Sequence, residues 1–203
     1  MEFDFMVDDT LAAVFVLATT TLFGMTCGVV QIIRKDLDPM HVPLTLYLNG
    51  PWGGAVRGAY YAMTAGLIVM AGILWGREER EPLGWVAPVL LVISALSLPV
   101  LVVTRPRPGH VFSKRSLYFH RGSTYFTFIN LIVAMCFVSL TQGAVGAAQS
   151  IWGLLLCILA VKGLALTIFA RDLPRGLVQK GLILTIVLWL YWAVASLLVG
   201  RAA

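Results

Sequence analysis

The chain has 203 residues, of which 59% are hydrophobic and only 12% are charged. A typical soluble domain has about 45–50% hydrophobic and 25% charged residues, and a soluble domain of this size could not bury so much apolar surface. The composition therefore excludes an ordinary water-soluble enzyme and a disordered chain. With three cysteines, an odd number, it also excludes a disulfide scaffold. It is typical of an integral membrane protein.

Six continuous apolar stretches are long enough to cross a bilayer as helices, which requires about 20 residues each. Continuous runs favour helices over a transmembrane barrel, whose strands alternate polar and apolar residues. We therefore predict an all-α, polytopic bundle of six transmembrane helices that forms a single domain over residues 1–203. The expected spans are 11–33, 58–76, 83–103, 124–141, 151–170 and 181–199.

The basic residues predict how the chain is threaded through the membrane. Short loops rich in Lys and Arg stay on the cytoplasmic side, because these residues resist translocation. With both termini outside, eleven of the fifteen basic residues lie inside. The first nine residues contain four acids and neither Lys nor Arg, which is the reverse of a signal peptide. We therefore expect an N-out, C-out topology whose basic face meets anionic lipids rather than nucleic acid.

Small residues four apart in the first two spans predict close helix packing. Gly24 and Gly28 have this spacing in the first span. Gly58, Ala62 and Gly66, followed by Gly72 and Gly76, have it in the second. The main expectation is packing of these two helices against each other within one chain. The alternative is a homo-oligomer formed through the same glycines.

The first cytoplasmic loop is too apolar to be a simple tether. Pro43 suits the start of a helix and Asn49-Gly50-Pro51 favours a turn, so we expect one or two helical turns over 43–48. In the preferred interpretation this segment lies in the headgroup layer through Leu44, Tyr47, Leu48 and Trp52. The alternative is a re-entrant segment that lines a cavity.

Lys162 is the only charged residue within an expected span, and no acid lies in any span to pair with it. A charge at this depth is costly, and the lysine stem is too short to reach either interface easily. Asn130 in the fourth span, hydroxyl groups or an anionic ligand could satisfy the ammonium group. Three interpretations stay open: a lysine hydrogen-bonded inside the bundle, partial snorkelling, and a ligand site.

The segment 104–123 gathers basic residues and histidines on the cytoplasmic side. In the main interpretation this segment fixes the orientation of the protein in the membrane and contacts anionic lipid. In the more specific interpretation it forms a phosphate-binding site. His41 lies on the same side, but the spacing of the histidines matches no metal-ligand signature, so we predict neither a metal nor a cofactor. The basic residues and histidines of this segment are Arg105, Arg107, His110, Lys114, Arg115, His120 and Arg121. Of these we expect Arg105, Arg107, Lys114, Arg115 and His120 to bind an anion.

Several short motifs, taken in order along the chain, resemble a known family. They are Asp38-Pro39, the run from Pro43 to Gly53, Arg57-Gly-Ala-Tyr-Tyr-Ala, His120-Arg-Gly, and the run from Leu173 to Lys180 before the last span. Together they resemble the bacterial integral-membrane family called domain of unknown function 998. The resemblance implies six helices in a bacterial inner membrane and no established activity, so no catalytic residues are implied. The acidic element usual after the third span is replaced here by Arg105-Pro-Arg-Pro.

Three functions are consistent with these features. The first is binding or transport of a lipid or a small apolar or anionic molecule. In this case Lys162 and Asn130 line the polar part of the site, and the basic face engages a phosphate. The second is an enzyme that acts on a lipid phosphate through His110, His120 and their basic neighbours. The third is an accessory subunit that packs against a larger complex.

Overall fold

The computed structural model describes residues 9–76, 84–105, 114–141, 147–170 and 172–199. These residues form six α-helices and one short 3-10 helix, with no strand among them. All six α-helices are long and apolar enough to cross a membrane, which confirms the predicted six-helix, all-α architecture. The elements are α1 (Asp9–Ile33), η1 (Leu44–Leu48), α2 (Gly53–Trp75), α3 (Val86–Val103), α4 (Lys114–Thr141), α5 (Ala147–Phe169) and α6 (Arg175–Val199).

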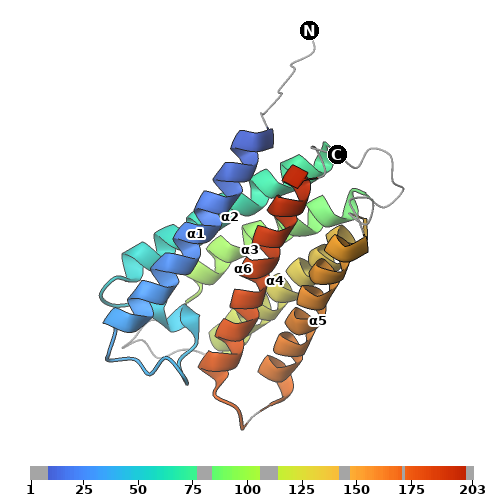
Figure 1. Ribbon diagram of the computed structural model, residues 1–203. Coiled ribbons are helices and arrows are strands. Elements are labelled where there is room, and N and C mark those ends of the chain that lie inside the picture. Colours follow the sequence, from blue (N-terminus) through green and yellow to red (C-terminus); the bar gives the residue numbers. More distant parts are fainter. Residues whose placement is uncertain (1–8, 77–83, 106–113, 142–146, 171, 200–203) are drawn as a thin grey trace.

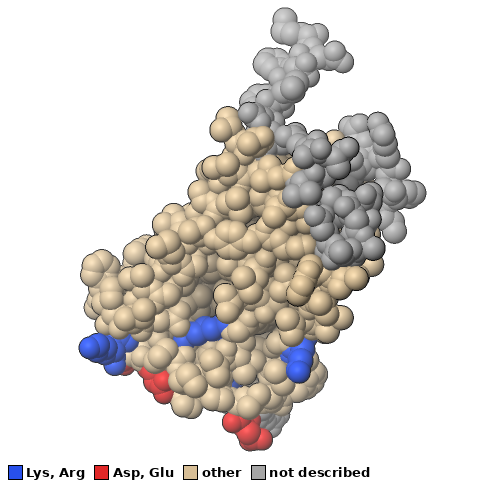
Figure 2. Space-filling view, in the orientation of Figure 1, with Lys and Arg blue, Asp and Glu red and all other residues tan. Residues whose placement is uncertain are grey.

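The six helices run side by side in alternating directions, and η1 lies at one end of the bundle (Figure 1). Each helix packs against the next one along the chain, and α1 also contacts α6. The start of α1 and the end of α6 lie at the same end of the bundle. We call the opposite end, where η1 and the starts of α2, α4 and α6 lie, the basic end. The charged side chains visible in the space-filling view lie toward this end (Figure 2).

Three helices begin well before the expected spans, all at the basic end. The helix α4 begins at Lys114, so half of the segment predicted as a basic loop is helical. The helices α2 and α6 also begin early, at Gly53 and Arg175. The first turns of α4 and α6 carry polar side chains, and α2 begins with two glycines, so hydropathy does not mark these turns. Backbone hydrogen bonding continues there regardless, because no proline interrupts residues 114–123.

Hydrogen bonds and close backbone approach hold the helices together in the core. Thr19 of α1 packs directly against Gly66 of α2. The fully buried indole of Trp189 in α6 donates a 3.0 Å hydrogen bond to Ser139 Oγ in α4. A buried indole N–H needs such an acceptor, so this contact fixes the position of α6 against α4.

The predicted packing of the first two spans against each other is confirmed, and Gly66 is one of the predicted small residues in that contact. The other predicted glycines make no such close approach. A Cβ added at Gly24, Gly28, Gly58 or Gly72 would meet nothing within 4 Å, and one added at Gly76 would meet only atoms of its own helix. A homo-oligomer formed through Gly24, Gly28, Gly72 and Gly76 stays a prediction.

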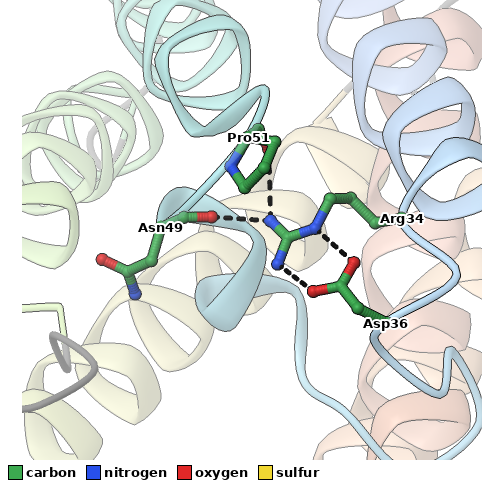
Figure 3. A network of polar contacts seen from close by, with 4 residues as sticks. All are labelled: Arg34, Asp36, Asn49 and Pro51. Atoms are coloured by element: carbon green, nitrogen blue, oxygen red, sulfur yellow. Dashed lines mark hydrogen bonds and ion pairs between the residues drawn. The ribbon is translucent and has the colours of Figure 1, made fainter.

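Arg34, just after α1, organises the connection to α2 (Figure 3). Its guanidinium is buried and forms two hydrogen bonds, of 2.7 and 2.6 Å, with the Asp36 carboxylate. It also donates to the carbonyl oxygens of Asn49 (2.7 Å) and Pro51 (3.1 Å). Gly50 has a positive φ of 70°, and a Cβ there would lie 3.2 Å from the guanidinium. The turn after η1 is thus wrapped around the Arg34 side chain.

This wrapping places η1 inside the protein. The predicted helical turn over 43–48 is confirmed, but Leu44, Tyr47 and Leu48 are at most 1% exposed. They pack into the core of the bundle rather than into a headgroup layer, so that expectation is wrong. Trp52 alone of the four predicted surface residues is exposed. The alternative interpretation, a segment that lines a cavity, describes η1 better.

The tight contact at Gly66 predicts that alanine substitutions at two glycines of α2 have opposite effects on stability. A Cβ at Gly66 would lie 2.3 Å from Thr19 Oγ1, which is itself held by hydrogen bonds to the carbonyls of Phe15 and Val16. We expect Gly66→Ala to reduce stability by about 1–3 kcal/mol through overpacking. Gly72→Ala, in open space, should gain a few tenths to about 1 kcal/mol from helix propensity. Melting curves in detergent measure both, and equal effects would contradict the packing.

The Arg34 contacts predict a pH-dependent contribution to stability. We expect Arg34→Gln to lower the free energy of unfolding by about 2 kcal/mol, because the buried Asn49 carbonyl and the partly buried Pro51 carbonyl lose a charged donor. The hydrogen bonds from Arg34 also hold the pKa of the Asp36 carboxyl below its usual value. The contribution of the Arg34–Asp36 pair to the free energy of unfolding is fully present above the pKa of Asp in the unfolded chain, about 3.9. It is lost as the pH falls through the lower pKa of the folded protein.

Thermal melts of the wild type and Arg34→Gln between pH 7 and pH 3 measure this contribution. The stability difference between the two proteins should narrow on the acid side. A constant difference across this range would contradict the pairing. Asp36→Asn is the matched variant: it removes the titrating group, but the two carbonyl contacts of Arg34 remain.

Candidate functional site

A cavity of about 430 Å³ lies at the basic end, and we call it the basic-end cavity. Four separate segments form its wall: the residues before and within η1, the first turns of α4, the last turn of α5 and the first turns of α6. The lining residues are His41, Pro43, Thr45, Leu46, Leu117, His120, Arg121, Thr124, Tyr125, Thr167, Arg175 and Gln179.

The segment before η1 is held against the start of α6. The backbone N–H of Leu177 donates to the Met40 carbonyl at 2.9 Å. A Cβ at Gly176 would lie 2.6 Å from the Val42 carbonyl oxygen, so only glycine fits this close approach. Lys180 Nζ donates to the Pro39 carbonyl. These contacts form one wall of the basic-end cavity.

Gln179 connects this wall to η1. Its side-chain Oε1 accepts a 3.1 Å hydrogen bond from the backbone N–H of Leu44, the first residue of η1. The first N–H groups of a helix have no partner within the helix, so Gln179 supplies the missing acceptor. Because Gln179 is buried and also lines the cavity, it couples the position of η1 to the shape of the site.

The lining of the basic-end cavity favours negative charge. It includes Arg121 and Arg175, and none of its lining residues in the described chain is acidic. Asp38 lies nearby and pairs with His41, with Oδ2 and Nδ1 2.5 Å apart. This hydrogen bond from His41 holds the pKa of the Asp38 carboxyl below its usual value. The Asp38 carboxylate is therefore engaged by a histidine, and the described cavity lining offers no acidic partner to the two guanidinium groups.

His120 is buried in the cavity wall, at 6% exposed. Its Nδ1 lies 3.2 Å from the hydroxyl of Thr104, which follows α3. The same hydroxyl lies 2.7 Å from the Val100 carbonyl oxygen, one turn earlier in α3. His120 is thus fixed in orientation by a neighbouring helix, as a side chain with a binding role would need to be.

A second, apolar cavity of about 50 Å³ adjoins the first inside the bundle. Thr45, Thr124 and Gln179 line both cavities, so these three side chains form the boundary between them. Beyond this boundary the wall is aromatic and aliphatic, with residues such as Phe23, Leu67, Phe128, Leu131 and Ile186. The lining of the two cavities thus changes from basic at the end of the bundle to apolar in its interior.

Of the predicted site residues that the structure describes, only one lines the basic-end cavity. His120 lines the basic-end cavity, whereas Arg115 is exposed and lies outside its lining. Arg105 joins α3 to η1 instead: it donates to the Asn49 side chain at 3.1 Å and to the Val102 carbonyl at 2.6 Å. Lys114 begins α4, and its side chain lies outside the described set. Arg107 and His110 lie outside the described residues.

Lys162 and Asn130 do not form the predicted polar site inside the bundle. Lys162 is exposed on α5, and neither residue lines the two cavities above. Asn130 donates a 2.7 Å hydrogen bond to the Phe126 carbonyl of its own helix. Of the three interpretations of Lys162, a lysine hydrogen-bonded inside the bundle disagrees with its exposed side chain, and partial snorkelling stays a prediction. Whether either residue binds a ligand stays a prediction.

Of the residues that line the cavity, the predicted ligand set contains only His120, and it misses Arg121, Arg175 and Gln179 among others. His41, considered above only in relation to a metal site, also lines the cavity. A signal was present for α6, because Arg175 and Gln179 lie four apart on one helix face and Arg175 directly follows Pro174. No group of three or more His, Cys, Asp or Glu side chains suited to a metal ion occurs within the described residues.

The family resemblance agrees with the fold. No curated protein and no solved structure matches the chain. The family described as Protein of unknown function (DUF998) matches residues 10–196, which includes all six helices and the cavity. The chain is therefore a multi-pass membrane protein that belongs to the DUF998 family.

Proposed function

We propose that this protein binds an anionic amphiphile, with the headgroup in the basic-end cavity and the start of an acyl chain toward the apolar cavity. One observation carries the proposal: a cavity lined by two arginines and two histidines continues into an apolar cavity inside the bundle. A ligand that matches this sequence of surfaces has a charged end and an apolar end.

The charge of the ligand follows from the arginines. Arg121 projects from α4 and Arg175 from α6, so they approach the cavity from different helices. Guanidinium groups bind phosphate and carboxylate with two parallel hydrogen bonds each. With no acid in the described lining, an anionic headgroup would neutralise these two cations. A cationic headgroup would meet only repulsion there.

The amphiphilic character of the ligand follows from the apolar cavity. At about 50 Å³ it has room for only a short piece of chain. Its walls offer few hydrogen-bonding groups, so a free inorganic anion would gain nothing from it. The remainder of an acyl chain would lie in the bilayer, along the apolar outer surface of the helices.

The orientation of the protein is part of this proposal. We infer that the basic end faces the cytoplasm and both termini face outward, in the inner membrane of a bacterium. The positive-inside rule supports this placement, because most of the Lys and Arg residues lie in or near the connections at that end. The ligand would then come from the anionic inner leaflet.

A second candidate is chemistry on a lipid phosphate. His41 and His120 line one cavity, and histidines can act as general acids, bases or nucleophiles. No carboxylate in the described lining orients His120, as one commonly does for a catalytic histidine. For this reason we place binding first. An accessory role in a larger complex stays a prediction.

The binding proposal is tested with phosphatidylglycerol and phosphatidylcholine, titrated against the protein in nanodiscs and measured by native mass spectrometry. We expect phosphatidylglycerol to bind preferentially and to be recovered chemically unchanged. Arg121→Gln with Arg175→Gln should weaken its binding about tenfold or more, because two charged hydrogen-bonding groups are lost. The preference should also fall with increasing salt.

Arg121→Gln alone is compared with Arg115→Gln, the matched control, since each removes one positive charge from α4 and Arg115 lies outside the cavity lining. An equal loss of binding in these two single variants would point to surface charge instead of a site, and would overturn the proposal. Glycerol 3-phosphate is added as a competitor to distinguish a lipid from a free headgroup. If it displaced the lipid at equal concentration, the apolar cavity would have no role and the ligand would be a soluble anion.

The orientation is tested with fusions to the C-terminus. We expect alkaline phosphatase fused there to be active and green fluorescent protein to be dark, because the positive-inside rule places this end in the periplasm. A matched pair of fusions within the α5–α6 connection should give the opposite result. A fluorescent C-terminal fusion would overturn the N-out, C-out orientation.

A further inference from the structure

The hydrogen bonds around His120 determine which of its ring nitrogens carries the proton. Among the described residues, Thr104 is the one hydrogen-bond partner of the ring, through Nδ1 at 3.2 Å. A neutral imidazole has one N–H donor and one acceptor nitrogen. Thr104 therefore decides whether Nδ1 or Nε2 is the donor.

Thr104 has a single hydroxyl proton, and two acceptors compete for it. Its Oγ1 lies 2.7 Å from the Val100 carbonyl oxygen, which can only accept, and 3.2 Å from His120 Nδ1. The shorter contact takes the proton, as is common for threonine hydroxyls in helices. The hydroxyl oxygen then turns a lone pair toward His120, so Nδ1 must carry the proton and donate.

The surroundings of His120 favour the neutral ring. An unperturbed imidazole is already mostly neutral at pH 7. The charged and titratable groups that line its cavity are Arg121 and Tyr125 from its own helix, Arg175 from α6, and His41 from the segment before η1. Thr104, its contact just after α3, is uncharged. The described lining contains two arginines and no carboxylate, so an imidazolium would have no counter-charge in the cavity.

We infer that His120 Nε2 accepts a hydrogen bond from a hydroxyl group on the bound headgroup. A neutral ring with the proton on Nδ1 has its lone pair on Nε2, and the ring lines the basic-end cavity. The ligand class is then an anionic lipid whose headgroup carries a hydroxyl beside its phosphate. Thr104 is a positioning residue in this scheme. The inference rests on the proposed function, because it assigns one further contact to the same bound lipid.

The test compares phosphatidylglycerol with phosphatidylmethanol, which has the same charge and the same chains but no headgroup hydroxyl. We expect the wild-type protein to prefer phosphatidylglycerol about fivefold, the effect of one net hydrogen bond. Thr104→Val should reduce this ratio to about one, since Nδ1 loses its acceptor and no longer determines which nitrogen is protonated. Thr104→Ser should retain the preference. Thr185→Val, another helical threonine bonded to its own helix, is the control with an unchanged ratio.

Nitrogen NMR of ¹⁵N-histidine-labelled protein provides a second, independent readout. The chain has three histidines, so the His120 signals can be assigned by substitution of His41 and His110. We expect a protonated Nδ1 and an unprotonated Nε2 in the wild type, and a changed or mixed pattern in Thr104→Val. If Thr104 had only a structural role, the Thr104→Val substitution would leave the proton on Nδ1.

The outcomes separate this inference from the proposal on which it rests. Equal affinity for the two anionic lipids, both above phosphatidylcholine, would overturn the hydroxyl contact and leave anionic lipid binding in place. No preference over phosphatidylcholine would overturn the proposed function itself. A protonated Nε2, or an unchanged lipid ratio in Thr104→Val, would overturn the role given to Thr104.

Discussion

The attachment of the α1–α2 connection to the first turns of α6 is the contact on which the basic end depends. A connection of this length could extend into water, but here its backbone is held against Gly176 and its N–H and carbonyl groups are paired. Arg34 fixes the other half of the same connection by bonding to the carbonyls that follow η1. With both halves held, η1 lies within the bundle, and the space between it, α4 and α6 becomes a defined cavity.

Hydropathy predicts the six helices but not where they begin. A helix inside hydrocarbon must satisfy all its backbone groups internally, so each long apolar run is necessarily a helix. Outside the hydrocarbon this constraint ends, and the polar first turns of α4 and α6 carry no such signal. Those turns supply Arg121 and Arg175, two of the residues that give the cavity its charge. The part of the fold hardest to predict from the sequence is therefore the part that forms the site.

Lys162 shows a second limit of reasoning from the sequence. Its depth in the membrane follows from its position along α5, but the direction of its side chain around the helix axis does not. The helix is apolar on nearly all sides, so no polar stripe indicates which face is turned inward. An interior position, one of the three interpretations, followed from the cost of an exposed charge in lipid, yet the structure has this side chain facing outward. His120 was predicted from local clustering, and it does line a cavity because Thr104 and the start of α4 hold it there.

The two cavities and the fold share their central residues, which couples ligand binding to the packing of the basic end. Gln179 lines both cavities while its side chain accepts the hydrogen bond that holds the start of η1. Thr45 belongs to η1 itself and lines both cavities as well. A ligand that contacts these residues interacts only with the packed arrangement, because the unfolded connection offers no such surface. Ligand binding therefore stabilises the attachment of η1 to α6. Once the ligand concentration exceeds the dissociation constant, this stabilisation grows with the logarithm of the ratio of the two. A lipid in this position would be both the ligand of the protein and a part of its folded structure.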